Sequence, residues 1–151
     1  MIKNLSVLIL LVVISIGCQI DDFCTEGTTS NLHIGFYDVD FPDKIKPTDS
    51  LTVWVTDKDT LYRYANVDSI LIPLDPNNDF TEYNFMARKN DKDTLIFNYT
   101  REEVFVSRSC GYKYNFENLD VDEVSISWIK SVIVENQSVT NEVERHVKIL
   151  H

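Results

Sequence analysis

Three cysteines, Cys18, Cys24 and Cys110, are the residues of this chain with the most distinctive chemistry. A thiol can carry a lipid, join a disulfide or, as a thiolate, act as a nucleophile. A nucleophile at Cys110 would need a base such as His33 or His146 at hydrogen-bond distance, and no local motif supports one. In an exported protein, an odd number of cysteines leaves one thiol without a disulfide partner unless one cysteine is modified. The role of these thiols therefore depends on whether the chain is exported.

Residues 1–17 have the organisation of a lipoprotein signal peptide. Lys3 is the only charged side chain there, and positions 5 to 16 are almost continuous leucine, valine and isoleucine. A membrane span needs about 20 apolar residues, so this shorter run is typical of a signal-peptide core. Ser15-Ile16-Gly17-Cys18 resembles a lipobox, where cleavage precedes a cysteine that then carries diacylglycerol. We expect lipidation of Cys18; the alternative is a plain secretory signal.

Lipidation of Cys18 would leave Cys24 and Cys110 as an even pair in a compartment where disulfides persist. We therefore expect these two cysteines to form a disulfide. Closing a loop of this length adds on the order of 4–5 kcal/mol in the chain-entropy model.

Residues 18–30 are expected to form a lipidated, acidic tether. Asp21 and Asp22 follow the lipid cysteine closely and resemble the surface-export signal of bacteroidete lipoproteins. That resemblance implies transport by lipoprotein export machinery and attachment to the outer face of the outer membrane. The alternative is attachment facing the periplasm, where two acidic residues simply keep a linker solvated.

The charge of the chain argues against nucleic acid as a partner. The formal net charge is −10, from 24 acidic and 14 basic residues. Without residues 1–17, 13 basic and 24 acidic residues remain, which gives −11. A field of this sign repels phosphate backbones and keeps a protein soluble.

From position 31 onward, short runs of alternating apolar and polar residues are separated by turn signals. Cys110, Tyr112, Tyr114 and Phe116 place a thiol and three rings on one face of a strand, as on an inner sheet surface. The pattern predicts that residues 31–151 form one all-β domain, an antiparallel, immunoglobulin-like β-sandwich of eight or nine strands. No substantial helix is expected after the signal segment.

Finer expectations follow from the same alternation. Residues 102–107 are expected to form a strand after residues 95–99, and residues 129–134 a long strand with a possible bulge. Pro73 places its strand at a sheet edge or ends it. Trp54, Tyr62 and Tyr64 are expected to share one face of a hairpin, either covering the core or binding a sugar or partner.

No metal or cofactor site is expected. Asp75-Pro76-Asn77-Asn78-Asp79 begins like a calcium loop, but the glycine and glutamate that an EF-hand needs are replaced by Phe80 and Met86. An Asn- and Asp-rich turn explains these residues. Asp38, Asp40 and Asp43 form a second acidic loop, interpreted as turn chemistry rather than as a weak cation site. His33, His146 and His151 lack metal-ligand spacing, and the first two are expected on solvent-facing strand positions.

Four tripeptides consist of Asp, then Ser or Thr, then an apolar residue. They resemble the O-glycosylation signal of exported bacteroidete proteins. Their acceptors are Ser50, Thr60, Ser69 and Thr94. Each also lies where a turn enters a strand, a position that favours the same residue types.

The mature chain resembles a family of bacteroidete outer-envelope lipoproteins classed as a domain of unknown function. Its most specific element is Ser107-x-x-Cys110-Gly111 combined with Cys24 in the tether. The other matching stretches are residues 33–38, 72–75, 93–95 with Tyr99, 106–112, 128–130 and 146–149. The resemblance implies an outer-envelope lipoprotein and supplies no activity, ligand or catalytic residue.

These observations favour a lipid-anchored binding or accessory module of the outer envelope, with an unidentified protein or glycan partner. The sequence contains no catalytic motif, so we do not expect an enzyme. One alternative is a small envelope hydrolase with a cleft of acidic residues such as Asp38 and Asp40. The other is a purely structural envelope component.

Overall fold

The computed structural model describes residue 24 and residues 29–87, 91–125, 127–140 and 142–151. Within these ranges the chain forms nine β-strands and no helix. Accordingly, this part of the chain offers no helix long and apolar enough to cross a membrane.

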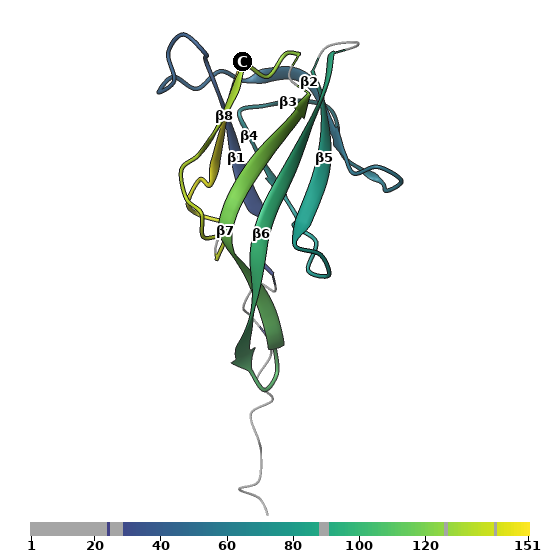
Figure 1. Ribbon diagram of the computed structural model, residues 1–151, viewed down its shortest axis with the longest axis vertical. Helices are drawn as coiled ribbons and strands as arrows, with labels where there is room; N and C mark the ends of the chain where they lie inside the picture. The colour runs from purple at the N-terminus through teal and green to yellow at the C-terminus, as the bar shows by residue number, and fades with distance from the viewer. Residues whose placement is uncertain (1–23, 25–28, 88–90, 126, 141) are drawn as a thin grey trace, which may run out of the picture.

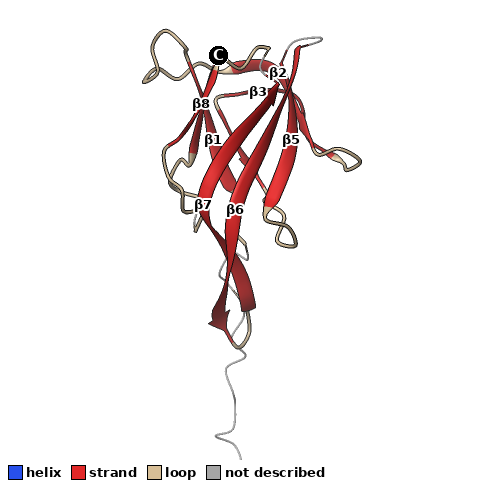
Figure 2. Cartoon of the chain, viewed as in Figure 1, coloured by secondary structure: helices blue, strands red, loops and turns tan. Residues whose placement is uncertain are grey.

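The strands form two sheets (Figures 1 and 2). The first has the order β4-β1-β9-β8 and the second the order β3-β2-β5-β6-β7. The strands are β1 (Leu32–Tyr37), β2 (Thr48–Trp54), β3 (Thr60–Val67), β4 (Ser69–Ile72), β5 (Phe80–Ala87), β6 (Asp91–Ser107), β7 (Gly111–Ser125), β8 (Ser131–Val134) and β9 (Val147–Leu150). The predicted all-β sandwich and its strand number are confirmed. One pairing differs from the antiparallel prediction, because β1 and β9 run parallel.

One hydrophobic core lies between the two sheets. Alternation explains its composition: Leu32, Ile34 and Phe36 point from β1 into the core and are fully buried. The five-stranded sheet contributes a ring cluster in which the Phe85 and Phe97 centroids lie 6.5 Å apart. Pro73 follows the edge strand β4, as its missing N–H predicts.

The hairpin of β6 and β7 extends beyond the rest of the sandwich (Figure 1). The expected break before residue 102 is absent, because β6 is one strand of 17 residues. Phe116 is fully buried and packs on Tyr99, with ring centroids 4.8 Å apart. Tyr112 is 62% exposed, and Cys110 lies in the turn before β7. The predicted inner face is therefore correct at Phe116 and wrong at the other end of the hairpin.

The expected long strand at residues 129–134 is also wrong at its first two residues. Only Ser131–Val134 forms β8. The backbone N–H groups of Ser127, Trp128 and Ile129 donate instead to the carboxylate of Asp93 on β6. These donors are satisfied by a side chain and cannot take part in a strand ladder.

Trp54, Tyr62 and Tyr64 are expected to share one face of the β2–β3 hairpin, but the pairing of these strands is irregular. Several register shifts occur between β2 and β3, and Tyr64 has a positive φ of 52°. Trp54 and Tyr62 are half-buried, whereas Tyr64 is 69% exposed, so Tyr64 does not cover the core. The Tyr62 hydroxyl accepts a hydrogen bond from Leu71 N and donates one to Leu71 O, which joins β3 to β4.

Candidate functional site

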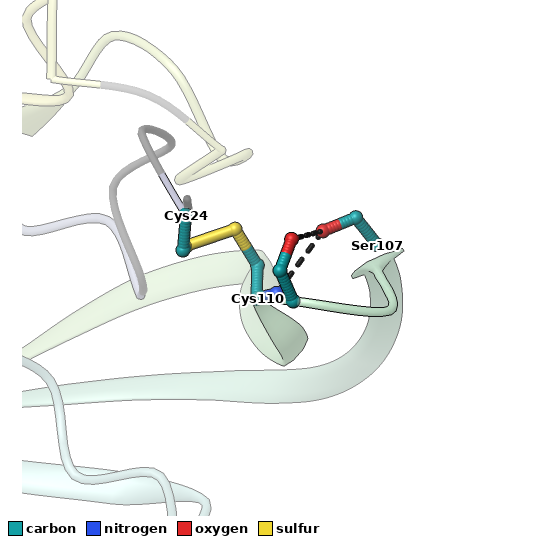
Figure 3. Close-up of a disulfide and its surroundings, with 4 residues drawn as sticks. Cys24, Ser107 and Cys110 are labelled. Atoms are coloured by element: carbon teal, nitrogen blue, oxygen red, sulfur yellow. Dashed lines mark hydrogen bonds between the residues drawn. A yellow bond between two sulfur atoms is a disulfide. The ribbon is translucent and has the colours of Figure 1, made fainter. Parts of the chain in front are cut away.

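The predicted disulfide between Cys24 and Cys110 is present, with a Cα–Cα distance of 4.9 Å (Figure 3). It lies at the turn of the β6–β7 hairpin, where Cys110 N donates to Ser107 Oγ at 3.0 Å. The bond removes the thiolate that a nucleophile at Cys110 would need. Cys18, the predicted lipid carrier, lies outside the described residues.

The four predicted glycosylation acceptors lie on four different strands and do not form one site. Ser50 on β2 is exposed, while Thr60 and Ser69 are half-buried. Thr94 is buried, and its hydroxyl donates to Asn84 Oδ1 at 3.0 Å. Of the four, Ser50 is therefore the hydroxyl position most open to a modifying enzyme.

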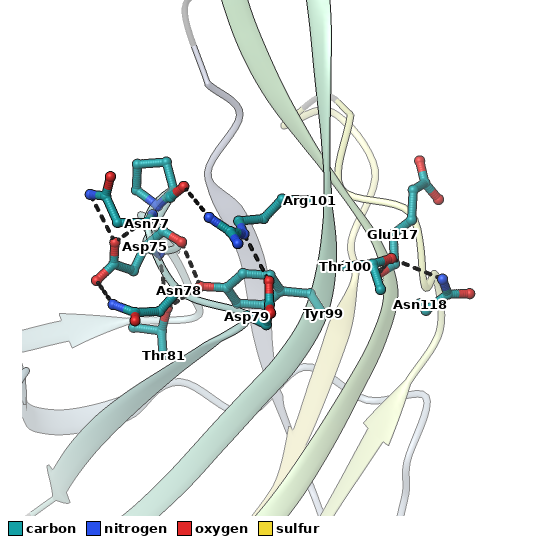
Figure 4. A network of polar contacts seen from close by, with 11 residues as sticks. Asp75, Asn77, Asn78, Asp79, Thr81, Tyr99, Thr100, Arg101, Glu117 and Asn118 are labelled. Atoms are coloured by element: carbon teal, nitrogen blue, oxygen red, sulfur yellow. Dashed lines mark hydrogen bonds and ion pairs between the residues drawn. The ribbon is translucent and has the colours of Figure 1, made fainter.

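The loop between β4 and β5 is a turn built around Asp75 (Figure 4). The Asp75 carboxylate accepts hydrogen bonds from Asn77 N at 2.9 Å and from Asn78 Nδ2 at 3.0 Å. The bond from Asn77 N, followed by that from Asn78, holds the Asp75 pKa below its usual value. These contacts support the predicted Asn- and Asp-rich turn. No cluster of three potential metal ligands is found among the described residues.

Beside this turn, a cleft of about 830 Å³ separates the β2–β3 turn from the β4–β5 loop. Lys58 and Asp75 form an ion pair in its wall, with a separation of 3.8 Å. Tyr83 closes the inner side by donating its hydroxyl to Pro73 O, and burial raises the Tyr83 pKa. The lining side chains can bind a ligand, but they include no serine, cysteine or histidine to act as nucleophile or imidazole base.

The expectation that His33 and His146 face solvent is wrong for His146. His146 is fully buried, and its Nδ1 accepts a hydrogen bond from His33 N at 3.0 Å. This bond requires an unprotonated Nδ1. Burial, and next the neighbouring His33, lower the pKa of His146 below its ordinary value.

Acidification is expected to destabilise the fold partly through His146. Its pKa is lower in the folded than in the unfolded state, so the unfolded state binds the proton first as the pH falls. The imidazole pKa in the unfolded chain is about 6.5. Above this pH the neutral imidazole contributes fully to the stability of the fold, and the contribution is lost as the pH falls toward the lower pKa of the folded state. In urea unfolding from pH 7 to 5, His146→Asn should show a shallower decline than the wild type. An equal decline in both proteins would contradict this role.

The loop between β1 and β2, residues 38–46, is termed the distal loop. It lies at the opposite end of the long axis from the turn of the β6–β7 hairpin (Figure 1). Asp38 Oδ1 accepts from Asp40 N at 2.8 Å and from Phe41 N at 3.3 Å, and Asp38 Oδ2 lies 3.4 Å from Lys46 Nζ. Phe41 O also accepts from Lys44 N at 2.8 Å. The loop is therefore held in a defined conformation.

This ordered loop presents apolar side chains to solvent. Phe41 is 66% exposed, and Val39 and Ile45 are exposed beside it. A cluster of exposed apolar side chains can mark an interaction site, and binding residues are often carried by loops on a rigid scaffold. Phe41 is a candidate binding residue that the sequence interpretation missed. The sequence signal is an aromatic residue between Asp40 and Pro42, in a segment too rich in turn residues to be a core strand.

Two acidic side chains of the distal loop, Asp38 and Asp43, are held by hydrogen bonds or ion pairs. The hydrogen bond from Asp40 N, together with Lys46, lowers the pKa of Asp38. Asp43 is paired with Lys148 at 3.9 Å. A general acid needs a raised pKa, so the lowered pKa of Asp38 does not support Asp38 as the general acid of a hydrolase.

These features define a class of protein: a disulfide-closed β-sandwich with a long hairpin at one end and, at the other, an ordered loop with an exposed phenylalanine. Residues 50–151 match the model of a family of unknown function, DUF6452, and the chain belongs to this family. The family carries no assigned activity. No curated protein and no solved structure matches the chain. That the family consists of bacteroidete lipoproteins stays a prediction.

Proposed function

We propose that this protein is a lipid-anchored component of the outer membrane, exposed at the cell surface, that binds a partner protein through the distal loop. The leader of residues 1–17 and the position of Cys18 support the anchor. The Cys24–Cys110 disulfide supports an exported location, because such bonds persist in oxidising compartments. Ser50 is the proposed acceptor if the protein is O-glycosylated.

The observation that carries the binding role is the conformation of the distal loop. Folding leaves Phe41 largely exposed although Asp38 and Lys46 fix the surrounding backbone. A pre-ordered loop loses little conformational entropy on binding, and a central aromatic side chain is a common source of affinity. The partner surface is expected to be an apolar pocket on a protein. Export and anchoring place this loop where such a partner could reach it.

Site-specific photocrosslinking tests this function. Phe41 is replaced by benzoylphenylalanine in the full chain, and the native cells are irradiated. We expect one defined protein adduct. Phe41→Ser should weaken binding of the captured partner by about 30-fold, the effect of losing a 2 kcal/mol contact, and should leave stability nearly unchanged because the side chain is exposed.

Phe80 provides the matched control, because it is also a phenylalanine with half its surface exposed, at the start of β5. The photoreactive residue at position 80 should give no such adduct. Equal adducts from both positions, or none from position 41, would refute the assigned binding loop. Protease treatment of the intact cells should remove the adduct, and its survival would place the protein on the periplasmic side.

A further inference from the structure

The turn end of the β6–β7 hairpin, residues 104–113, is termed the hairpin tip. Phe105 and Tyr112 lie directly opposite each other on its two strands. Their rings are 5.3 Å apart in an edge-to-face arrangement. Phe105 is 56% exposed and Tyr112 is 62% exposed. This aromatic pair therefore faces solvent, beyond the sheet region where Tyr99 and Phe116 enter the core.

The charge of the hairpin tip is opposite to that of the chain. Residues 104–113 contain Arg108 and Lys113 and no acidic residue, although the whole chain has 24. Arg108 is exposed at the turn. Exposed aromatic rings and basic side chains within one short segment are a combination that favours the interface of a bilayer, where rings lie among headgroups and cations near phosphates.

The disulfide ties this tip to the start of the described chain. Cys24 is bonded to Cys110 within the tip, and it follows the predicted lipid carrier Cys18 by six positions. Six residues extend over at most about 20 Å. A lipid on Cys18 would therefore keep Cys24 within that distance of the bilayer surface. Cys110 in the hairpin tip lies a further 4.9 Å away, measured between the Cα atoms of the disulfide.

We propose that the hairpin tip is a second membrane contact, with Phe105 and Tyr112 in the headgroup region and Arg108 and Lys113 beside lipid phosphates. This inference rests on the proposed lipid anchor. The contact would direct the long axis of the sandwich away from the bilayer. The distal loop, at the other end of that axis (Figure 1), would then be held at the greatest distance from the membrane.

Quenching of tryptophan fluorescence by brominated lipid tests this contact. The mature protein, as processed by the native cell, is placed in vesicles of phosphatidylcholine and phosphatidylglycerol, with and without bromine on the acyl chains. Tyr112→Trp should show at least twofold more quenching than the wild type, whose Trp54 and Trp128 are the background. Tyr64→Trp is the matched control, because Tyr64 is a similarly exposed tyrosine on β3. It should show only the background.

Charge reversal of Arg108 and Lys113 to glutamate in the Tyr112→Trp protein should remove most of the added quenching. Flotation of the vesicles separates the two possible failures. A protein that does not float lacks the anchor, which refutes the proposed attachment. A protein that floats while Tyr112→Trp and Tyr64→Trp are quenched equally keeps its anchor, and the membrane contact of the hairpin tip is then wrong. The vesicles hold no other protein, so quenching reports lipid alone.

Discussion

Replacing Asp93 with alanine is expected to lower the free energy of unfolding by about 3–5 kcal/mol. Asp93 is fully buried. Its Oδ2 accepts from Trp128 N at 2.9 Å and from Ile129 N at 2.8 Å, and its Oδ1 accepts from Ser127 N. Alanine would leave three backbone donors without this partner in the segment leading into β8. An unsatisfied buried donor costs about 1–3 kcal/mol, so the loss exceeds that of an ordinary core polar substitution.

Asp91→Ala is the matched control, because Asp91 is an exposed aspartate on the same strand, two positions earlier. It should change stability by less than about 0.5 kcal/mol. Asp93→Asn should fall between the two, since the amide keeps one acceptor oxygen and loses the other. Urea unfolding of the three variants gives the comparison. If Asp93→Ala and Asp91→Ala have similar midpoints, Asp93 does not hold the residue 127–129 segment.

The role of Asp93 changes the interpretation of the tripeptide that begins with it. Asp93-Thr94-Leu95 resembles a glycosylation signal, yet all three residues are buried. The carboxylate of Asp93 holds another segment, and the Thr94 hydroxyl donates to Asn84. Hydrogen bonding in the folded protein therefore accounts for these residue types without any modification.

Alternation of residue types was sufficient to predict the sandwich, because strands such as β1 place Leu32, Ile34 and Phe36 on one buried face. Alternation could not predict how far along a strand the residues of one face remain buried. Tyr112 and Phe116 lie an even number of positions apart on β7 and share one face, but only Phe116 is buried in the core. A period of two indicates which side chains share a face, whereas their burial depends on what packs against that face.

Long-range hydrogen bonds explain the other differences. His146 is buried, and its Nδ1 accepts a hydrogen bond from His33 N, which is 113 positions away in the sequence. The carboxylate of Asp93 likewise acts on residues more than 30 positions later. Neither partner can be identified from local spacing. The candidate site was missed for a related reason: only the fold shows that Asp38 and Lys46 hold the loop carrying Phe41.

Removal of the disulfide, in the variant Cys24→Ser with Cys110→Ser, is expected to cost about 4–5 kcal/mol of stability. The bonded residues are 86 positions apart, so the bond restricts most of the unfolded chain. For a chain of this size the loss corresponds to a fall in Tm of roughly 10 °C or more. The near-ultraviolet circular dichroism of the folded state should change little, because this mechanism acts mainly on the unfolded ensemble.

Reduction supplies the control for this variant. A reducing agent should lower the Tm of the wild type to that of the double variant and should leave the double variant unchanged. If the free energy of unfolding falls by less than about 1 kcal/mol, the bond does not stabilise the fold by restricting the entropy of the unfolded chain. The bond would then serve chiefly to fix the hairpin tip close to Cys24. In that case the double variant should keep its stability and its lipid anchor, while the bromine quenching of Tyr112→Trp falls.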